Sequence, residues 1–349
     1  MDRREFLLAL TCLTASSCKR TRSKREVLSA LVREVVTPDV RAVVLASRAL
    51  RESVAAFAAT PSPSGLRAAR EACRTALPAW KRAHCFRNGP MVETNALLRA
   101  TFWPARPPAI EGALAGTAPL DDDSIEALGA DAKGLYALEY LLFPLELDEQ
   151  QTLRQLGGEG SERRRSLLCA LARNVETHAN AASGVLGDGT AYAQRFAAGG
   201  QDSISRLVNQ MISSVETLAV SRLDLVLGLA QSRLLKPAEV EGWPSGTSHL
   251  LALAELTGVR QLYGGGERTG LTDLVRAVAP AIDQRLERSV STAVGALEKL
   301  DAPLERVVLE RRPLLASALA SLKALELALK VDVASALGVT LTFQTGDGD

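Results

Sequence analysis

Apolar side chains recur at helical spacing along most of this chain. The spacing predicts helices from about residue 26 to 35, from Pro38 to about 59, and over 66–86, 162–182 and 203–235, with further helices to about 331. Alternation of β-branched and polar residues, which is typical of strands, is hard to find. Ala and Leu are abundant and aromatic residues make up only 4% of the chain. The pattern predicts an all-α protein.

Segments rich in Pro, Gly and Ser interrupt the helical pattern, most clearly at residues 60–65, 87–90, 104–108, 236–246 and 264–266. Each half of the chain contains several helices and one irregular polar segment. A chain of 349 residues can bury two cores. We predict two four-helix-bundle-like domains packed together, over residues 26–200 and 201–345.

The N-terminus has the features of an export signal over residues 1–18. Arg3 and Arg4 precede an apolar run of nine residues, which resembles a twin-arginine signal and is too short to span a bilayer. Residues 15–18, Ala-Ser-Ser-Cys, resemble a bacterial lipobox, so that Cys18 would be the lipidated first residue of the mature protein. The alternative is ordinary signal cleavage nearby, with a soluble product.

A basic tether follows at residues 19–25, Lys-Arg-Thr-Arg-Ser-Lys-Arg. We expect a solvated, disordered arm that anionic lipid headgroups could attract. The predicted protein is an exported lipoprotein on the periplasmic side, anchored in the inner or outer membrane. The formal net charge of +1 gives no electrostatic reason for a nucleic-acid partner, and none is expected.

Motifs of common hydrolases are missing from the sequence. His84, His178 and His249 are far apart and form no HExxH motif, and no CxxC pair supports a thiolate zinc site. Ser245 lies in Pro-Ser-Gly, which is not the GxSxG sequence of a nucleophile elbow. These patterns disfavour a zincin or a serine hydrolase.

One carboxylate, Glu139, lies near the centre of the apolar run Gly-Leu-Tyr-Ala-Leu-Glu-Tyr-Leu-Leu-Phe at residues 134–143. On a helix, Tyr136 and Glu139 share one stripe and both stripes of the run look buried. A buried carboxylate must be hydrogen-bonded, paired or bound to a metal. Glu139 is therefore either a member of a structural network or part of a site.

This run resembles the Gly-x-His-x-x-Glu signature of the imelysin family, also called M75 peptidase-like. Trp80 and the Phe-Trp-Pro sequence at residues 102–104 are similar to upstream landmarks of that family. The segments at residues 241–248 and 258–266 are similar to its second half. Together these features cover roughly residues 30–335 in the expected order.

The resemblance implies two helical bundles with a pocket near their junction, in an exported protein, often a lipoprotein, linked to iron acquisition. The motif His and Glu have been proposed as metal ligands of a peptidase. Here Tyr136 takes the His position, and Tyr is a poor ligand for Zn²⁺, whereas a phenolate with a carboxylate could suit Fe³⁺. Peptidase activity is disfavoured, and whether this chain is an enzyme is left undecided.

The expected ligand-binding residues follow from these motifs. Glu139 is the candidate metal ligand for iron or another divalent or trivalent ion, with buried hydrogen-bond acceptor as the alternative. Tyr136 could share its face or donate a hydrogen bond to it. Arg82 and Arg87 could neutralise it, or be solvated. Trp80 is expected either to contact the ligand or to pack at the seam between the two domains.

Glu241, Ser245 and Ser248 lie on an irregular segment that opens a helix, where free backbone N–H groups suit anions; helix capping is the alternative. We expect a metal or small-ligand binding lipoprotein of iron uptake, with iron-uptake proteins as partners. One alternative is a metallopeptidase using Glu139, which would need a histidine within coordination distance. The other is a structural or interaction lipoprotein, which a closed junction with Glu139 paired to Arg would favour.

Overall fold

The computed structural model describes residues 22–87, 96–266 and 269–342, and all of the regular secondary structure in these ranges is helical. The predicted all-α fold is confirmed. The predicted signal peptide with Cys18, and residues 19–21 of the tether, lie outside the described residues. None of the helices in the described ranges is both long and apolar enough to cross a membrane.

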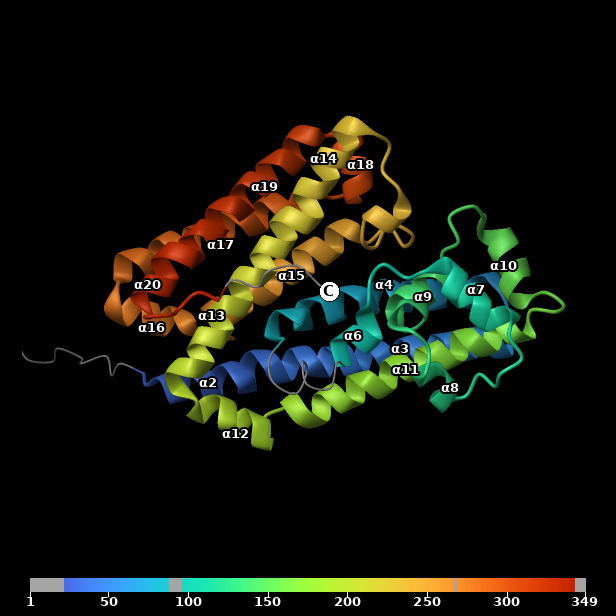
Figure 1. Ribbon diagram of the computed structural model, residues 1–349, viewed down its shortest axis with the longest axis horizontal. Coiled ribbons are helices and arrows are strands. Elements are labelled where there is room, and N and C mark those ends of the chain that lie inside the picture. The colour runs from blue at the N-terminus through green and yellow to red at the C-terminus, as the bar shows by residue number, and fades with distance from the viewer. Residues whose placement is uncertain (1–21, 88–95, 267–268, 343–349) are drawn as a thin grey trace, which may run out of the picture.

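The first part of the chain forms the lower group of helices in Figure 1, coloured blue to green. Its helices are α2 (Lys24–Leu31), η1 (Val32–Val36), α3 (Thr37–Ala59), α4 (Pro63–Ala83), η2 (His84–Phe86), α6 (Ala96–Thr101), α7 (Pro107–Ala115), α8 (Asp122–Glu126), η3 (Ala130–Ala132), α9 (Gly134–Leu142), α10 (Glu149–Gly157), α11 (Glu162–Leu186) and α12 (Ala191–Ala198).

The second part forms the upper group, coloured yellow to red. Its helices are α13 (Gly200–Glu216), η4 (Thr217–Asp224), α14 (Leu225–Ser232), η5 (Pro237–Glu239), α15 (Ser248–Gly264), α16 (Leu271–Val278), α17 (Pro280–Glu298), α18 (Leu304–Glu310), α19 (Arg312–Leu327), η6 (Ala328–Val333) and α20 (Ala334–Ala336). The buried apolar side chains of both groups form one continuous cluster. The division into domains at residues 200 and 201 stays a prediction.

The predicted interruption between residues 35 and 38 is wrong, because α2, η1 and α3 follow one another without a loop. The π-helical turn η1 ends where Thr37 N–H bonds to the carbonyl of Val32. Pro38 lies in the first turn of α3, where a missing N–H costs little. Proline here marks a change of helical register and not the end of the helix.

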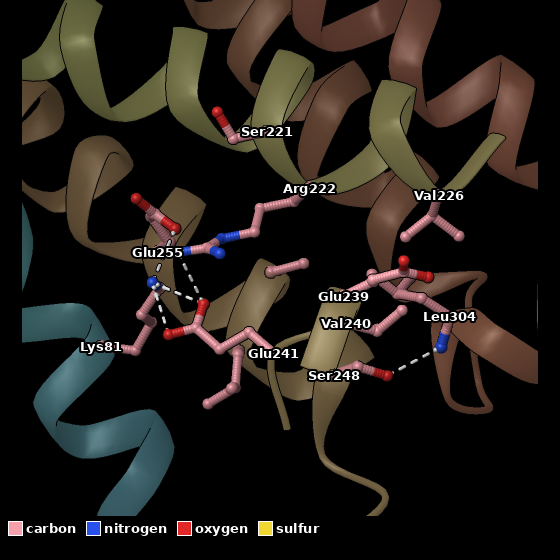
Figure 2. A pocket seen from close by; sticks show the side chains of 12 residues that line it. Lys81, Ser221, Arg222, Val226, Glu239, Val240, Glu241, Ser248, Glu255 and Leu304 are labelled. Carbon is pink, nitrogen blue, oxygen red and sulfur yellow. Dashed lines mark hydrogen bonds and ion pairs between the residues drawn. The ribbon is translucent and has the colours of Figure 1, made fainter. Parts of the chain in front are cut away.

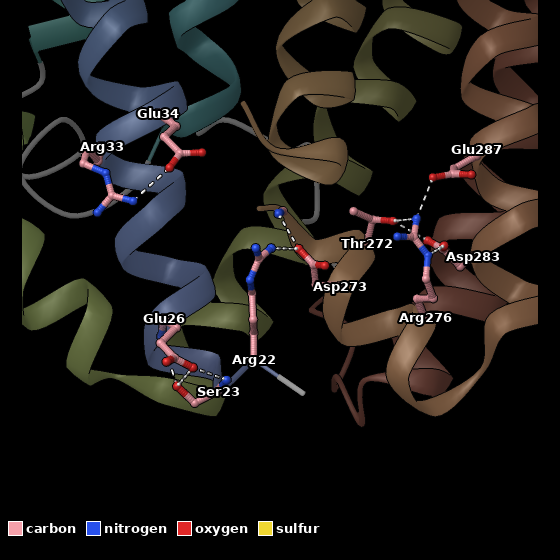
Figure 3. A network of polar contacts seen from close by, with 11 residues as sticks. Arg22, Ser23, Glu26, Arg33, Glu34, Thr272, Asp273, Arg276, Asp283 and Glu287 are labelled. Carbon is pink, nitrogen blue, oxygen red and sulfur yellow. Dashed lines mark hydrogen bonds and ion pairs between the residues drawn. The ribbon is translucent and has the colours of Figure 1, made fainter. Parts of the chain in front are cut away.

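The prediction of a disordered arm is also wrong for residues 22–25. Ser23 caps α2, and its hydroxyl accepts a hydrogen bond from the N–H of Glu26 while the Glu26 carboxylate returns to the N–H of Ser23. Arg22 Nη1 lies 3.0 Å from Asp273 Oδ2 at the start of α16. Figure 3 shows this contact between Arg22 and Asp273.

Helix α4 joins the two groups of helices, since it packs against α3 on one side and α15 on the other. The close approach of α4 and α15 requires Gly258, because a Cβ there would lie 2.6 Å from the carbonyl oxygen of Arg82 and 2.7 Å from Cys85 Sγ. Helix α9 also packs against α4. Its first residue, Gly134, has φ +77° and touches the backbone of α6. These contacts bring α9 towards α15.

Candidate functional site

Glu139 lies on α9 and faces the segment of residues 240–247 that precedes α15. Its side chain is buried, and the Oε1 atom accepts a 3.2 Å hydrogen bond from the Ser245 backbone N–H and a second one from the Ser245 hydroxyl. The backbone carbonyl of Ser245 in turn accepts a 2.9 Å hydrogen bond from Arg74 Nε on α4. The 240–247 segment is thus fixed to both α9 and α4.

Glu241 is the centre of a second buried network, which we call the Glu241 cluster: Lys81, Tyr136, Arg222, Glu241 and Glu255. Lys81 Nζ and Arg222 Nη2 each lie 2.8 Å from Glu241 Oε2, and the Tyr136 hydroxyl donates to Oε1. Lys81 Nζ is also 3.6 Å from Glu255 Oε2. Figure 2 shows Lys81, Arg222 and Glu255 pointing towards Glu241 from three different helices.

A cavity of about 10 Å³ lies beside the Glu241 cluster and is lined by Arg222 and Glu255. Within the described residues, Arg222 Nε and Glu255 Oε2 make no direct hydrogen bond. A space of this size suits one water molecule with polar partners. The cluster combines two cations and two carboxylates, so its formal charges balance.

The two buried carboxylates differ in their pKa values. Burial raises the pKa of Glu241, but Arg222 and Lys81 outweigh burial and hold it at about 2. Burial, together with the charges of Glu241 and Glu305, raises the pKa of Glu139 to about 7, although the hydrogen bonds from Ser245 act in the opposite direction. Glu241 is therefore ionised at neutral pH, whereas Glu139 exchanges its proton near pH 7.

A cavity of about 550 Å³ opens beside Glu139. Small-molecule sites in proteins commonly have volumes of about 300–1,000 Å³. The residues that line it come from the turn after α6, from α7, from α9 and the turn after it, from α10, and from the irregular segment before α15. They are Trp103, Pro104, Ala105, Pro107, Tyr136, Glu139, Tyr140, Phe143, Pro144, Leu145, Glu146, Leu147, Gln155, Lys236, Pro237, Ala238 and Pro244.

The structure brings four of the sequence-predicted residues together: Tyr136, Glu139, Glu241 and Ser245. Ser248 lies in a neighbouring contact, where its hydroxyl donates to Glu305 Oε2 at 2.7 Å and accepts from the N–H of Leu304 at 2.8 Å. Within the 240–247 segment, the N–H and the hydroxyl of Ser245 donate to the carboxylate of Glu139. The expected role of the segment's N–H groups in binding an anion is therefore met in part by Glu139.

Two expectations about hydrogen-bond and ion-pair partners are wrong, whereas Arg87 has the solvated position that was its alternative. Tyr136 does not donate to Glu139, because its hydroxyl reaches across to Glu241. Arg82 does not neutralise Glu139, because it pairs with Asp39 on α3 at 2.7 Å. Arg87 is exposed at the end of η2 and lines neither cavity.

Trp80 is a core residue of the helix packing and not a wall of the site. Its indole N–H donates a 3.0 Å hydrogen bond to Ser47 Oγ on α3, and its side chain is fully buried. Trp103 is the tryptophan that lines the larger cavity, and Arg222 lies 5.0 Å from the centroid of its ring. The indole that borders the cavity therefore belongs to the Phe-Trp-Pro sequence at residues 102–104.

Sequence analysis missed Lys81, Arg222 and Glu255. Each lies on a helix with many apolar positions. Lys81 is more than 100 residues from Glu241 and Glu255, and Arg222 reaches Glu241 from a different helical element. One signal was available: Lys81 lies one turn beyond Leu77 on the buried face of α4. A charged residue on a buried helical face predicts a buried counter-charge.

The histidines have different partners, although His84 lies close enough to Lys81, Glu241 and Arg222 for their charges to act on it. His84 Nε2 is 2.9 Å from Thr101 Oγ1, and burial lowers the pKa of His84 to about 3. His178 Nε2 is 3.0 Å from Glu126 Oε2, and burial likewise lowers the pKa of His249. Within the described residues, no three His, Cys, Asp or Glu side chains are grouped so that they could hold a metal ion.

The family model described as imelysin, of the M75 peptidases, matches residues 36–329. This chain belongs to the imelysin family. The matched range includes α9, the 240–247 segment and the whole Glu241 cluster. In this imelysin, Tyr136 holds the position at which the signature carries His. The hydroxyl of Tyr136 supplies a hydrogen-bond donor for Glu241, where a metal-ligating imidazole would offer a lone pair.

Two solved structures share the fold of this imelysin. One is an iron-regulated protein A precursor from Parabacteroides distasonis ATCC 8503, 14% identical, with a TM-score of 0.75 over 93% of this chain and 97% of that one. The other is an imelysin-like protein from Psychrobacter arcticum 273-4, 18% identical, with a TM-score of 0.68 over 92% of this chain and 97% of that one. No curated protein matches the chain.

Proposed function

We propose that this imelysin is an exported, lipid-anchored binding protein of the cell envelope that holds a small ligand in the 550 Å³ cavity and acts in iron uptake. The observation that carries the proposal is the position of Glu139. Ser245 fixes its Oε1, and the side chain lines the cavity. A buried carboxylate held in place by other groups, at the wall of a cavity of this size, is suited to recognising a ligand.

The envelope location rests on the sequence. Two arginines, a short apolar run and Cys18 in a lipobox-like context form the expected order of an exported lipoprotein. The link to iron rests on the similar protein from Parabacteroides distasonis, which is described as iron-regulated. The same link is implied by the family resemblance.

The described donors do not fit direct coordination of a metal ion. The Tyr136 hydroxyl donates to Glu241, and burial holds its pKa well above the ordinary value of 10, so that no phenolate is available near pH 7. No three His, Cys, Asp or Glu side chains of the described chain converge on one point. The site fits a small molecule, or a metal ion that arrives with its own ligands.

Two observations favour a binding site over a purely structural junction. Glu139 is hydrogen-bonded by Ser245 and not neutralised by Arg82, and a cavity lies beside it. A site that served packing alone would be filled by side chains, since protein interiors are close-packed.

Calorimetry on the purified mature protein tests the proposal. Fe²⁺, Fe³⁺ and Zn²⁺ are titrated as free ions, and Fe³⁺ also as its desferrioxamine B complex, which carries a free ammonium group, into the wild type and Glu139→Ala. We expect the free ions to bind weakly and the complexed iron to bind the wild type at least about tenfold more tightly than Glu139→Ala. Equal affinity of both proteins for every form of iron would refute Glu139 as the ligand-binding group.

A cellular experiment tests the process. A strain that lacks this protein is expected to grow more slowly than the parent when iron is restricted, and at the parental rate when iron is plentiful. Complementation with the wild-type gene should restore growth, whereas complementation with the Glu139→Ala gene should not. Growth of the deletion strain at the parental rate under iron restriction would argue against a role in iron uptake.

A further inference from the structure

The floor and the rim of the 550 Å³ cavity differ in charge. Among the described residues that line it, the charged side chains are Glu139, Glu146 and Lys236. Glu146 and Lys236 are exposed at the rim, where water screens both, whereas the Glu139 side chain is only 3% exposed. A ligand inside the cavity therefore meets one buried charged group, and that group is a carboxylate.

The arginines behind the walls of the cavity are engaged outside it, and Arg222, which lies over the ring of Trp103, pairs with Glu241. Arg70 Nε donates to the carbonyl of Leu142 at 2.7 Å, and Arg74 Nε donates to the carbonyl of Ser245. Both guanidinium groups lie over the ring of Phe143, at 5.4 and 4.8 Å from its centroid. They support the wall of the cavity and satisfy backbone carbonyls without forming an ion pair with Glu139.

The protein charges that act most strongly on Glu139 are negative. Glu241 and Glu305 both favour the protonated form of Glu139, and Ser245 supplies only neutral hydrogen bonds. Glu241 itself has two cations, Lys81 and Arg222, within 2.8 Å. The protein therefore neutralises one of its two central buried carboxylates and leaves the other, at the cavity, without a counter-charge from the described residues.

The walls of the cavity are apolar. Besides Glu139, the lining consists mainly of aromatic rings and prolines, which offer flat surfaces and no charge. These residues are Trp103, Tyr136, Tyr140, Phe143, Pro104, Pro107, Pro144, Pro237 and Pro244. Such surfaces suit an apolar or aromatic group, and aromatic faces also attract cations.

We propose that the ligand is a small organic molecule with a positively charged nitrogen beside an apolar or aromatic body, and that Glu139 recognises the charge. This inference rests on the proposed function and names the ligand class of the same cavity. The ammonium or guanidinium group supplies the counter-charge that Glu139 lacks, and the apolar body packs against the ring and proline walls. Charge-assisted hydrogen bonds of this kind are about twice as strong as neutral ones.

Three small probes of similar shape test the ligand class on the mature protein: 2-phenylethylammonium, 2-phenylethanol and 3-phenylpropionate. Calorimetry should show the ammonium probe binding at least about tenfold more tightly than the other two. Glu139→Gln, which keeps the shape of the side chain and removes its charge, should abolish this preference. Glu71→Gln, an exposed residue of α4 outside the cavity, is the control and should behave as the wild type.

Failure of the ligand class and failure of the cavity can be told apart. Ala238→Trp places a large ring in the cavity at an exposed lining position. If the alcohol or the carboxylate binds the wild type as tightly as the ammonium and is lost in Ala238→Trp, the proposed ligand class is wrong and the cavity remains a binding site. If the ammonium probe does not bind, or binds Glu139→Gln equally well, the inference is overturned, and the iron titrations decide the proposed function separately.

Discussion

Glu139 and Glu241 have the same type of side chain but lie in two different electrostatic environments. Both are almost completely buried, and the two lie on facing segments. Glu241 has two cations and a tyrosine hydroxyl as partners, whereas Glu139 has a serine N–H and a serine hydroxyl. The difference between a pKa of about 2 and one of about 7 follows from these partners, since burial acts on both.

The raised pKa of Glu139 predicts a pH-dependent stability. The folded protein holds this proton up to about pH 7, whereas the unfolded chain releases it near the ordinary value of 4.5. The stabilisation is complete below pH 4.5 and is lost as the pH rises through 7. Urea unfolding at pH 4 and pH 8 should show that the wild type loses about 3 kcal/mol more than Glu139→Gln. Equal losses in the two proteins would contradict the raised pKa.

The hydroxyl of Tyr136 is expected to stabilise the fold. Tyr136→Phe removes the donor to a buried carboxylate and should lower the free energy of unfolding by about 2 kcal/mol. Tyr140→Phe on the same helix is the matched control. Its hydroxyl lies 3.0 Å from Glu111 in a half-buried position, so a loss below about 1 kcal/mol is expected. Equal losses in chemical denaturation would assign no special role to the Tyr136 contact.

At the scale of elements, the long helix of residues 200–232 carries a π-helical segment, η4, in its middle. Such segments are often found at functional sites because they change which side chains face a neighbour. In this protein η4 carries Arg222, which reaches Glu241 and lies over the ring of Trp103. Arg222, which comes from the second group of helices, thus belongs to the Glu241 cluster and also contacts a wall of the cavity.

Replacing Arg222 tests this link between elements. Arg222→Met leaves Glu241 with Lys81 as its one cation among the described residues and should cost about 3 kcal/mol of unfolding free energy. Arg222→Lys keeps the charge but loses the planar group over Trp103, so a smaller loss of about 1 kcal/mol is expected.

A salt bridge between η4 and α19 provides the control for the Arg222 variants. Lys323 Nζ lies 3.0 Å from Asp224 Oδ2, and both side chains are about half exposed. Lys323→Met should change the unfolding free energy by no more than about 0.5 kcal/mol. A loss for Arg222→Met as small as that for Lys323→Met would show that the Glu241 cluster does not depend on Arg222.

At the scale of the molecule, α4 and α15 hold the two groups of helices together. Lys81 and Glu255, on these two helices, both belong to the Glu241 cluster. Gly258 allows the backbone of α15 to approach the end of α4. The position of the cluster therefore depends on how closely these two helices pack.

A methyl group at Gly258 should weaken this contact. The Cβ of Gly258→Ala would meet a backbone oxygen at 2.6 Å, so a loss of about 2 kcal/mol is expected in urea unfolding. Gly295 in α17 has no neighbour within 4 Å of the same Cβ position. Gly295→Ala should therefore stabilise the protein by up to about 1 kcal/mol, because alanine favours the helix interior. If both variants were neutral, the close approach of α4 and α15 would not be required.

The proposed lipid anchor predicts a change in the location of the whole molecule. Cys18→Ser removes the thiol to which a lipid would be attached, and the protein should move from the membrane fraction to the soluble fraction of cell lysates. Mass spectrometry of the wild-type N-terminus should detect a mass consistent with acylation at Cys18. An unmodified N-terminus beyond residue 18 would instead support ordinary signal cleavage.

Helical periodicity was sufficient to predict the fold class and most helices, because each long helix places its apolar residues on one face. It failed at Pro38, where a π-helical turn lets the chain continue as a helix. For the site, the motif identified Tyr136 and Glu139. The expected hydrogen bond from Tyr136 to Glu139 and the expected ion pair of Glu139 with Arg82 were wrong. Hydrogen bonds between residues more than 100 positions apart leave no periodic signal in one sequence.

The sequence by itself determined that the protein is all-helical, that Glu139 is buried, and that the chain resembles the imelysins, because these properties depend on local spacing and on short motifs. Only the tertiary structure decided that Tyr136 serves Glu241, that Lys81 and Arg222 neutralise Glu241, and that Glu139 borders a cavity. The physical reason is that the ionisation of a buried carboxylate depends on which charges the packing of distant helices brings within a few ångströms.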